Sequence, residues 1–268
     1  MKTMLFGALT AAALLLSCSN DDENSQIRPQ ELPVKVTQWN ASGALDIRQE
    51  IFYDNQQRIA EINITEANSA NNRTILYHYE SGKVTLNTDY LDPAKTDEMY
   101  IYYQNNGKIT KEMWYWGGAL FQVYTWTDNL VDGTKKAICK TGAGDLYRTY
   151  NYHFNSKGNC TSIRVNEADP TATDFTITFD AYDTHPRALF HHGWLSPWAV
   201  VPGVIRNPGL PNNPGTYQRT PDGQTPSYSH AFTYEYNTSG KVAFQRNYDE
   251  KNGSRLMSST VYEYSMIE

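Results

Sequence analysis

The side chains with the greatest capacity for chemistry are four histidines that fall near one another late in the chain. His185, His191, His192 and His230 could in principle supply imidazole ligands to a zinc ion. Their spacing does not fit such a site, because no HExxH, CxxC or DxDxDG pattern accompanies them. Adjacent histidines on one extended segment also point to opposite sides. We therefore expect neither a metal nor a cofactor.

Patterns for nucleophilic or phosphoryl chemistry are missing as well. The sequence holds no GxSxG motif and no glycine-rich phosphate loop. No pair of carboxylates, such as Glu61 with Glu66, stands out from ordinary surface charge. The sequence predicts a protein that is not an enzyme. One alternative stays open: a polysaccharide hydrolase whose two carboxylates lie far apart in the sequence.

Aromatic residues are the remaining candidates for a ligand-binding site, and they form two groups. Trp194, Trp198 and Tyr217 lie in a segment rich in proline and glycine, while Trp114 and Trp116 precede a Gly-Gly turn. Such rings either pack into a core and pair across strands or offer flat faces to a sugar or a peptide. The sequence leaves both uses open for both groups.

The first group belongs to a segment, 183–228, that holds most of the prolines and interrupts an otherwise regular pattern. So many prolines and glycines exclude a long helix. A long loop with its own apolar residues either carries function or covers a core. We expect an insertion in a larger domain, acting either as a plug over the core or as a binding loop.

The regular pattern that surrounds this segment is a short hairpin repeated along the chain. Stretches such as "YDNQQRI", "YQNNGKI", "FNSKGNC" and "YNTSGKV" share an aromatic residue, three turn residues, a glycine or its substitute, and a small apolar residue. The turn positions 57, 82, 107, 158 and 240 are separated by 25, 25, 51 and 82 residues. Residues on either side alternate with period two, which is typical of half-buried antiparallel strands. A fixed interval indicates a repeat architecture.

These repeats predict an all-β protein, an antiparallel meander of about fifteen strands built from hairpin units of about 25 residues. A meander must protect its edges, either by curling into a barrel or half-barrel or by capping an extended sheet, and we favour the curled form. A membrane-spanning barrel is disfavoured, because polar residues are expected on both faces of single strands, whereas a lipid-facing wall requires continuous apolar alternation. These residues are Lys111, Glu112, Arg164, Asn166, Arg246 and Asn247.

The amino terminus has the features of an export signal. Lys2 precedes an apolar run that ends in Ser17 and Cys18, which is too short to span a bilayer stably. The final "LSC" resembles the lipobox of bacterial lipoproteins. The resemblance implies a signal peptide over residues 1–17 and lipidation of Cys18, which would anchor the protein to a membrane.

Residues 18–33 are polar, acidic and proline-containing, and they cannot bury enough apolar surface to fold. We expect a tether here. Its acidic cluster, residues 21–23, resembles the signal that sends lipoproteins of Bacteroidetes to the cell surface, although a simple hydrated linker explains it equally well. The remaining residues, 34–268, form the predicted β-repeat domain.

The hairpins resemble two known groups of proteins. Their spacing is similar to tyrosine-aspartate (YD) repeats, although only Tyr53-Asp54 keeps the aspartate and Gln57 replaces the usual glycine. Lipobox, tether and degenerate hairpins together resemble an uncharacterised family of Bacteroidetes lipoproteins with a porin-like fold. That resemblance implies a β-barrel and an outer-membrane location, and it carries no function.

The composition limits the classes of partner that this protein is expected to bind. The net charge of −6 argues against nucleic acid, while 20 tyrosines among 13% aromatic residues supply material for a core. Cys139 and Cys160 are expected to be buried free thiols. We predict a non-catalytic outer-membrane lipoprotein, exposed at the cell surface or facing the periplasm. It would bind a glycan or a protein partner or serve as a scaffold.

Overall fold

The computed structural model describes residues 29–105, 108–129, 134–185 and 212–268, and these residues form one antiparallel sheet of sixteen strands. Two single-turn 3₁₀ helices, Ser69–Asn71 and Glu250–Asn252, lie in connections between strands. The strands are β1 (Gln30–Asn40), β2 (Leu45–Tyr53), β3 (Ile59–Glu66), β4 (Arg73–Glu80), β5 (Lys83–Tyr90), β6 (Glu98–Asn105), β7 (Lys108–Trp116), β8 (Ala119–Asn129), β9 (Thr134–Thr141), β10 (Leu146–Phe154), β11 (Cys160–Glu167), β12 (Phe175–Asp180), β13 (Thr216–Pro221), β14 (Tyr228–Tyr236), β15 (Val242–Asp249) and β16 (Arg255–Ile267).

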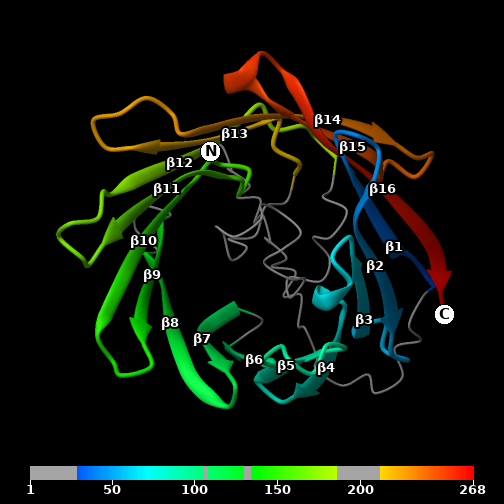
Figure 1. Ribbon diagram of the computed structural model, residues 1–268, viewed down its shortest axis with the longest axis horizontal. Helices are drawn as coiled ribbons and strands as arrows, with labels where there is room; N and C mark the ends of the chain where they lie inside the picture. The colour runs from blue at the N-terminus through cyan, green and yellow to red at the C-terminus, as the bar shows by residue number, and fades with distance from the viewer. Residues whose placement is uncertain (1–28, 106–107, 130–133, 186–211) are drawn as a thin grey trace, which may run out of the picture.

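The sheet closes into a barrel. Each strand pairs with its neighbours in the chain, and the circle is completed by β1 against β16, so the first and last strands lie side by side (Figure 1). Closure removes every free strand edge, which is the most complete protection against edge-to-edge aggregation. The predicted all-β antiparallel meander is confirmed, with sixteen strands in place of about fifteen, and its curled form is a closed barrel.

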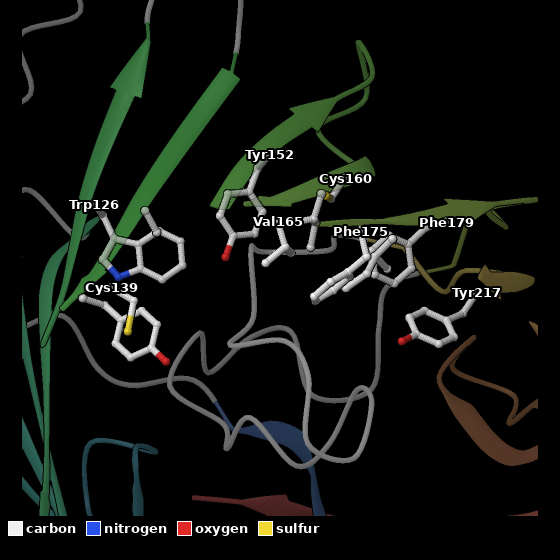
Figure 2. Packing of buried hydrophobic residues seen from close by; sticks show 12 residues of the cluster. Trp126, Cys139, Tyr152, Cys160, Val165, Phe175, Phe179 and Tyr217 are labelled. Carbon is white, nitrogen blue, oxygen red and sulfur yellow. The ribbon is translucent and has the colours of Figure 1, made fainter. Parts of the chain in front are cut away.

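One face of the sheet carries two large clusters of buried apolar side chains. The first lies on β1 to β6 and the second on β8 to β13. They share a face of the sheet, because Tyr102 of the first pairs with Glu112, which pairs with Tyr124 of the second. Figure 2 shows side chains of the second cluster on the concave side of the strands. The apolar face is therefore the inner wall of the barrel.

The outer wall is mostly polar. Lys35 forms an ion pair with Glu263 across β1 and β16, and Arg246 pairs with Glu235 across β15 and β14. Further charged and hydrogen-bonding groups alternate with the inner residues on the other strands: Glu50, Asn63, His78, Asn87, Lys111, Lys136, Lys140, Asn151, Arg164, Asn166, Thr176, Thr178 and Gln218.

A half-buried apolar patch interrupts this polar wall where Ile101, Met113 and Val123 lie in register across β6, β7 and β8. Thr85 of β5 and Lys140 of β9 flank it in register, so the patch does not extend around the barrel. A membrane-spanning barrel shows the reverse arrangement, with an apolar band outside. Within the described residues, no helix is both long enough and apolar enough to cross a bilayer.

The repeated turns share one hydrogen-bonding scheme. In Asp54–Arg58 the first carboxylate oxygen accepts bonds from the backbone of Gln56 and Arg58, each 2.9 Å long, and Gln57 adopts a left-handed φ of 58°. The turns 155–159 and 237–241 repeat this scheme with asparagine first and glycine fourth. Asp or Asn starts such a turn and glycine tolerates its positive φ, so the motif encodes the turn directly.

The recurring spacing of tyrosines along the chain also has a structural cause. The hydroxyl of Tyr79 donates a hydrogen bond to the backbone carbonyl of Ile59, 2.9 Å away and one hairpin earlier. Four other tyrosines donate in the same way to a carbonyl 20 or 22 residues earlier: Tyr53, Tyr182, Tyr234 and Tyr264. All five lie toward the end of the barrel where even-numbered strands turn into odd-numbered ones. We call this the tyrosine end.

Two boundaries and one strand face differ from those expected. β1 begins at Gln30, inside the expected tether, because Leu32 is buried in the barrel wall. β13 and the first residue of β14 lie within the segment 183–228, so the insertion between strands is shorter than predicted. The period-two pattern of β13 was hidden among its flanking prolines. Arg164 and Asn166 share the outer face and do not occupy both faces of β11.

Candidate binding site on the inner wall

Four aromatic rings gather on the inner wall at the end of the barrel opposite the tyrosine end. Tyr100 of β6 stacks on Trp114 of β7 with ring centroids 5.7 Å apart and planes 9° apart. Trp114 also stacks on Trp116 at 6.1 Å and meets Phe121 of β8 edge-on at 4.6 Å. We call Tyr100, Trp114, Trp116 and Phe121 the aromatic ledge.

The local sequence builds the ledge through a tight turn and an irregularity in strand pairing. Gly117 and Gly118 both have positive φ and join β7 to β8. The register shifts immediately beyond this turn, which leaves Phe121 without a partner on β7 and allows its ring to reach Trp114. Such a bulge re-aims a side chain at the rim of a barrel.

Gly142 on the neighbouring connection makes this irregularity possible. Its backbone N–H donates to the carbonyl of Phe121 over 2.8 Å. A Cβ atom at Gly142 would lie 1.9 Å from the carbonyl oxygen of Leu120, which is far inside van der Waals contact. The backbone can therefore approach β8 this closely only with glycine at position 142.

The ledge is half anchored and half exposed. Tyr100 is buried and Trp114 packs against the first inner cluster. Trp116 and Phe121, by contrast, keep 48% and 44% of their surface accessible. Large aromatic side chains usually bury most of their surface, so two adjacent exposed rings on a rigid base are characteristic of a contact surface.

A carboxylate lies directly beside the exposed rings. Glu98 of β6 is paired in register with Trp116. Its two carboxylate oxygens accept hydrogen bonds from the hydroxyls of Tyr100, at 2.6 Å, and Tyr90, at 3.1 Å. Burial, and then the negative charge of Glu98, raise the pKa of Tyr90 to about 12, so Tyr90 remains a donor across the physiological range.

A buried arginine on the same wall already forms an ion pair with another carboxylate. Arg73 of β4 forms an ion pair with Glu66, donates to the backbone carbonyl of Asn71, and lies 5.7 Å from the ring of Tyr90. Because its charge is matched by Glu66, Arg73 does not neutralise Glu98. The ledge thus combines two exposed rings with a carboxylate that is held by tyrosine hydroxyls.

The candidate residues from the sequence are only partly brought together. Trp114 and Trp116 lie side by side and form the centre of the ledge. Tyr217 does not offer a free ring: it belongs to β13, is 3% exposed and packs against Phe179 at 5.8 Å (Figure 2). Trp194, Trp198 and the lipidation candidate Cys18 lie outside the described residues.

Sequence reasoning missed Phe121, Tyr100 and Glu98. Phe121 carried a usable signal, since it follows the Gly-Gly turn that also presents Trp116. Glu98 and Tyr100 share one face by period-two alternation, and a meander places their strand beside β7, but the sequence did not fix the register that sets them opposite the tryptophans. Strand pairing alone brought them to the tryptophans.

The other side chains that could react are two cysteines and the histidines. Cys139 and Cys160 are buried thiols, as expected, and burial raises the pKa of Cys160 to about 12, so it stays protonated. His230 lies on the inner wall with Nδ1 3.0 Å from the side-chain oxygen of Asn247. Among the described residues no three His, Cys, Asp or Glu side chains are grouped to hold a metal. His191 and His192 lie outside those residues.

Comparison with known proteins identifies the fold. No protein-family model and no curated protein matches this sequence. Among solved structures, a porin-like protein from Bacteroides uniformis is similar, with a TM-score of 0.57 and 14% identity over 87% of this chain and 98% of the other. A porin-like protein from Bacteroides vulgatus is similar with a TM-score of 0.57 and 13% identity over 88% and 99%. This sixteen-stranded meander therefore has the fold of porin-like barrels from Bacteroides.

Proposed function

We propose that this chain is a non-catalytic, lipid-anchored barrel that binds a glycan through the aromatic ledge. The observation that carries the proposal is the pair of exposed rings, Trp116 and Phe121, fixed on a rigid strand wall beside Glu98. An apolar ring face with a few convergent polar groups is the usual composition of a small-molecule site.

The ledge suits a sugar because it can contact both the apolar C–H face and the hydroxyl groups of the sugar. The C–H face of a pyranose packs against an exposed aromatic ring, and its hydroxyls need hydrogen-bond acceptors. Glu98 keeps spare lone pairs, since each carboxylate oxygen accepts one tyrosine hydroxyl and can accept a second donor. A rigid wall adds affinity by lowering the ordering cost of binding.

The carboxylates on this wall support binding more than hydrolysis. A glycosidase needs one carboxyl group free to donate a proton and a second free to attack or to activate water. Glu98 is held by two tyrosine hydroxyls, and Glu66 is ion-paired with Arg73. Release of reducing sugar by the purified protein, lost in Glu98→Gln, would instead favour the hydrolase.

The wall chemistry and the proposed anchor both support a location outside the hydrocarbon of the outer membrane. The polar outer wall suits water, and burying its ion pairs in lipid would be costly. The likeness to porin-like barrels and the lipobox-like sequence at Cys18 support attachment to the outer membrane. A surface-exposed orientation would place the ledge within reach of extracellular glycans.

A glycan array tests the binding proposal. The protein carrying Cys18→Ala would be screened in parallel with the same protein carrying Trp116→Ala and Phe121→Ala. We expect binding to a defined set of sugars, weakened at least about tenfold by the double substitution, because exposed aromatic anchors dominate such contacts.

The matched control is Phe52→Ala, since Phe52 is 49% exposed on the outer wall and should not contribute. Silence across all sugars would refute the glycan proposal and leave a protein partner as the ligand. Equal loss in the Phe52 variant would show that the ledge has no special role.

The anchor has its own test. Cys18→Ala should move the protein from the membrane fraction to the soluble fraction, because a lipid chain supplies the attachment. Retention in the membrane fraction after this substitution would mean that the barrel itself, or a partner, holds the protein there.

A further inference from the structure

We infer that the aromatic ledge selects sugars that carry an ammonium group over neutral sugars, and neutral sugars over sugars that carry a carboxylate. This inference rests on the proposed function and adds the charge class of the ligand. It is drawn from the negative charges around Trp116 and Phe121 and from the ion pair that already holds the nearby Arg73.

The strand that flanks the ledge brings an excess of negative charge. The connection from β5 into β6 carries Asp92, Lys95, Asp97 and Glu98, so three carboxylates stand against one ammonium group. Asp97 lies close to the ledge, because its backbone carbonyl accepts the N–H of Gly117 at the end of β7. Its side chain is exposed and accepts a bond only from the backbone of Tyr90 among the described residues.

Positive charge near Glu98 is already matched. Arg73 is held by Glu66 and by a backbone carbonyl, as described above. Glu98 itself is engaged by neutral tyrosine hydroxyls, which leave its negative charge in place. As far as the described residues are concerned, a ligand that reaches Glu98 over the face of Trp116 therefore meets negative charge that Arg73 does not compensate.

Aromatic faces and carboxylates favour the same kind of ligand group. The electron-rich face of tryptophan attracts a cation within about 6 Å of the ring centre. An ammonium group also makes charge-assisted hydrogen bonds to a carboxylate, which are about twice as strong as neutral ones. An anionic sugar meets repulsion from Glu98 and Asp97, so the ledge discriminates by charge in both directions.

The test uses three oligosaccharides of equal length on the full chain: a fully deacetylated glucosamine oligomer, its N-acetylated form, and an oligogalacturonate. Calorimetric titration at low ionic strength should give the tightest binding for the deacetylated oligomer, by about tenfold over the N-acetylated form. Oligogalacturonate should bind most weakly.

Two variants test whether the charge of Glu98 causes the preference for the deacetylated oligomer. Glu98→Gln removes the negative charge and keeps one acceptor oxygen for a tyrosine hydroxyl. It should weaken binding of the deacetylated oligomer about tenfold more than binding of the N-acetylated form, so that the preference disappears. Glu50→Gln removes an exposed carboxylate from the outer wall and should change nothing. Melting temperatures of both variants would confirm that they are folded.

The outcomes separate the two proposals. Equal binding of the deacetylated and N-acetylated oligomers, or tighter binding of oligogalacturonate, overturns the charge preference and leaves the glycan proposal standing. A preference that survives in Glu98→Gln also overturns it as argued here. Failure of all three sugars, together with an empty glycan array, overturns the glycan proposal itself.

Discussion

The two ends of this barrel use aromatic residues for opposite purposes. At the tyrosine end, the hydroxyls of residues such as Tyr53 and Tyr79 donate hydrogen bonds to backbone carbonyls of the preceding hairpin. At the other end, Trp116 and Phe121 have no such bonds to make and keep nearly half of their surface exposed. One end closes the fold, and the other presents a surface.

The difference follows from the side chain's polar group and from the turn beside it. Tyrosine carries a hydroxyl that can reach a backbone carbonyl, so a repeated tyrosine produces a repeated tie between hairpins. The five-residue turns of the tyrosine end repeat one hydrogen-bonding scheme, each with the same register shift beside its aromatic residue. The Gly-Gly turn beside Trp116 is followed by a shift that leaves Phe121 without a partner on β7. The repeated turn therefore ties hairpins together, whereas the Gly-Gly turn re-aims a side chain.

The largest effect on the ledge end is expected from Gly142→Ala. The new Cβ would collide with the backbone of Leu120, so β8 and β9 must separate, and we expect the free energy of unfolding to fall by more than about 3 kcal/mol. Gly144→Ala in the same turn is the control. Its φ of 96° costs about 1 kcal/mol, but nothing lies within 4 Å of the new atom. Denaturant unfolding of both variants measures the difference, and equal losses would contradict the role of Gly142.

Within the ledge, Trp114→Ala should destabilise far more than Trp116→Ala. Trp114 is packed between Tyr100 and Phe121 on the first inner cluster, and removing it leaves a cavity that costs about 3 kcal/mol. Trp116 is half exposed, and its removal should cost about 1 kcal/mol or less. Thermal unfolding checks the order. A larger loss for Trp116 would mean that it is a structural residue and not a contact residue.

At the tyrosine end, Tyr79→Phe removes only the hydroxyl that bonds to Ile59 and should cost about 1 kcal/mol. Tyr147→Phe is the matched control, because Tyr147 is an exposed tyrosine. Arg148 lies 4.7 Å from its ring and would still contact phenylalanine there. Urea unfolding of the two variants should therefore differ. An unchanged midpoint for Tyr79→Phe would show that these hydroxyl bonds do not hold the hairpins together.

The smallest effect is expected from removing the charge of Asp54, and it depends on pH. Burial opposes ionisation of Asp54, but hydrogen bonds from the backbone of Arg58, its side chain and the backbone of Gln56 outweigh it and hold the Asp54 pKa below its ordinary 3.8. A lowered folded-state pKa stabilises the protein above pH 3.8, and this stabilisation is lost as the pH falls through the folded-state pKa.

Asp54→Asn keeps the acceptor that Asn155 and Asn237 supply in the equivalent turns, so it isolates the charge. We expect the variant to be less stable than the original by under about 1 kcal/mol at pH 7, because Arg58 is partly exposed and its ion pair with Asp54 is screened. The difference should disappear at acid pH, once the folded-state carboxyl group of Asp54 is protonated. Unfolding curves at both pH values measure it, and a constant difference would contradict the assignment.

The repeat could be predicted because it is local. The turn residues Asp54, Gly158 and Gly240 and the alternation around them encode each hairpin within a few residues, so the meander and its antiparallel pairing followed from the sequence. Closure could not be derived in this way, because the pairing of β1 with β16 joins residues more than 200 positions apart. The same limit hid β13, whose short pattern lies among prolines.

The site was less accessible than the fold for the same reason. Trp114 and Trp116 could be named from their spacing and from the turn that follows them. Their exposure could not, because it depends on how Phe121 and Gly142 distort the neighbouring strand. Tyr217 was misjudged because a ring near prolines suggests a loop, whereas pairing with β12 turns it into the core.

Hydroxyl-radical footprinting of the intact protein, with and without a glycan that it binds, tests most directly whether the ledge is the contact surface. Our account predicts that ligand lowers the oxidation of Trp116 and Phe121 and leaves the equally exposed Phe52 on the outer wall unchanged. Protection of Phe52 to the same extent, or no protection of Trp116 and Phe121 when the glycan is bound, would contradict it.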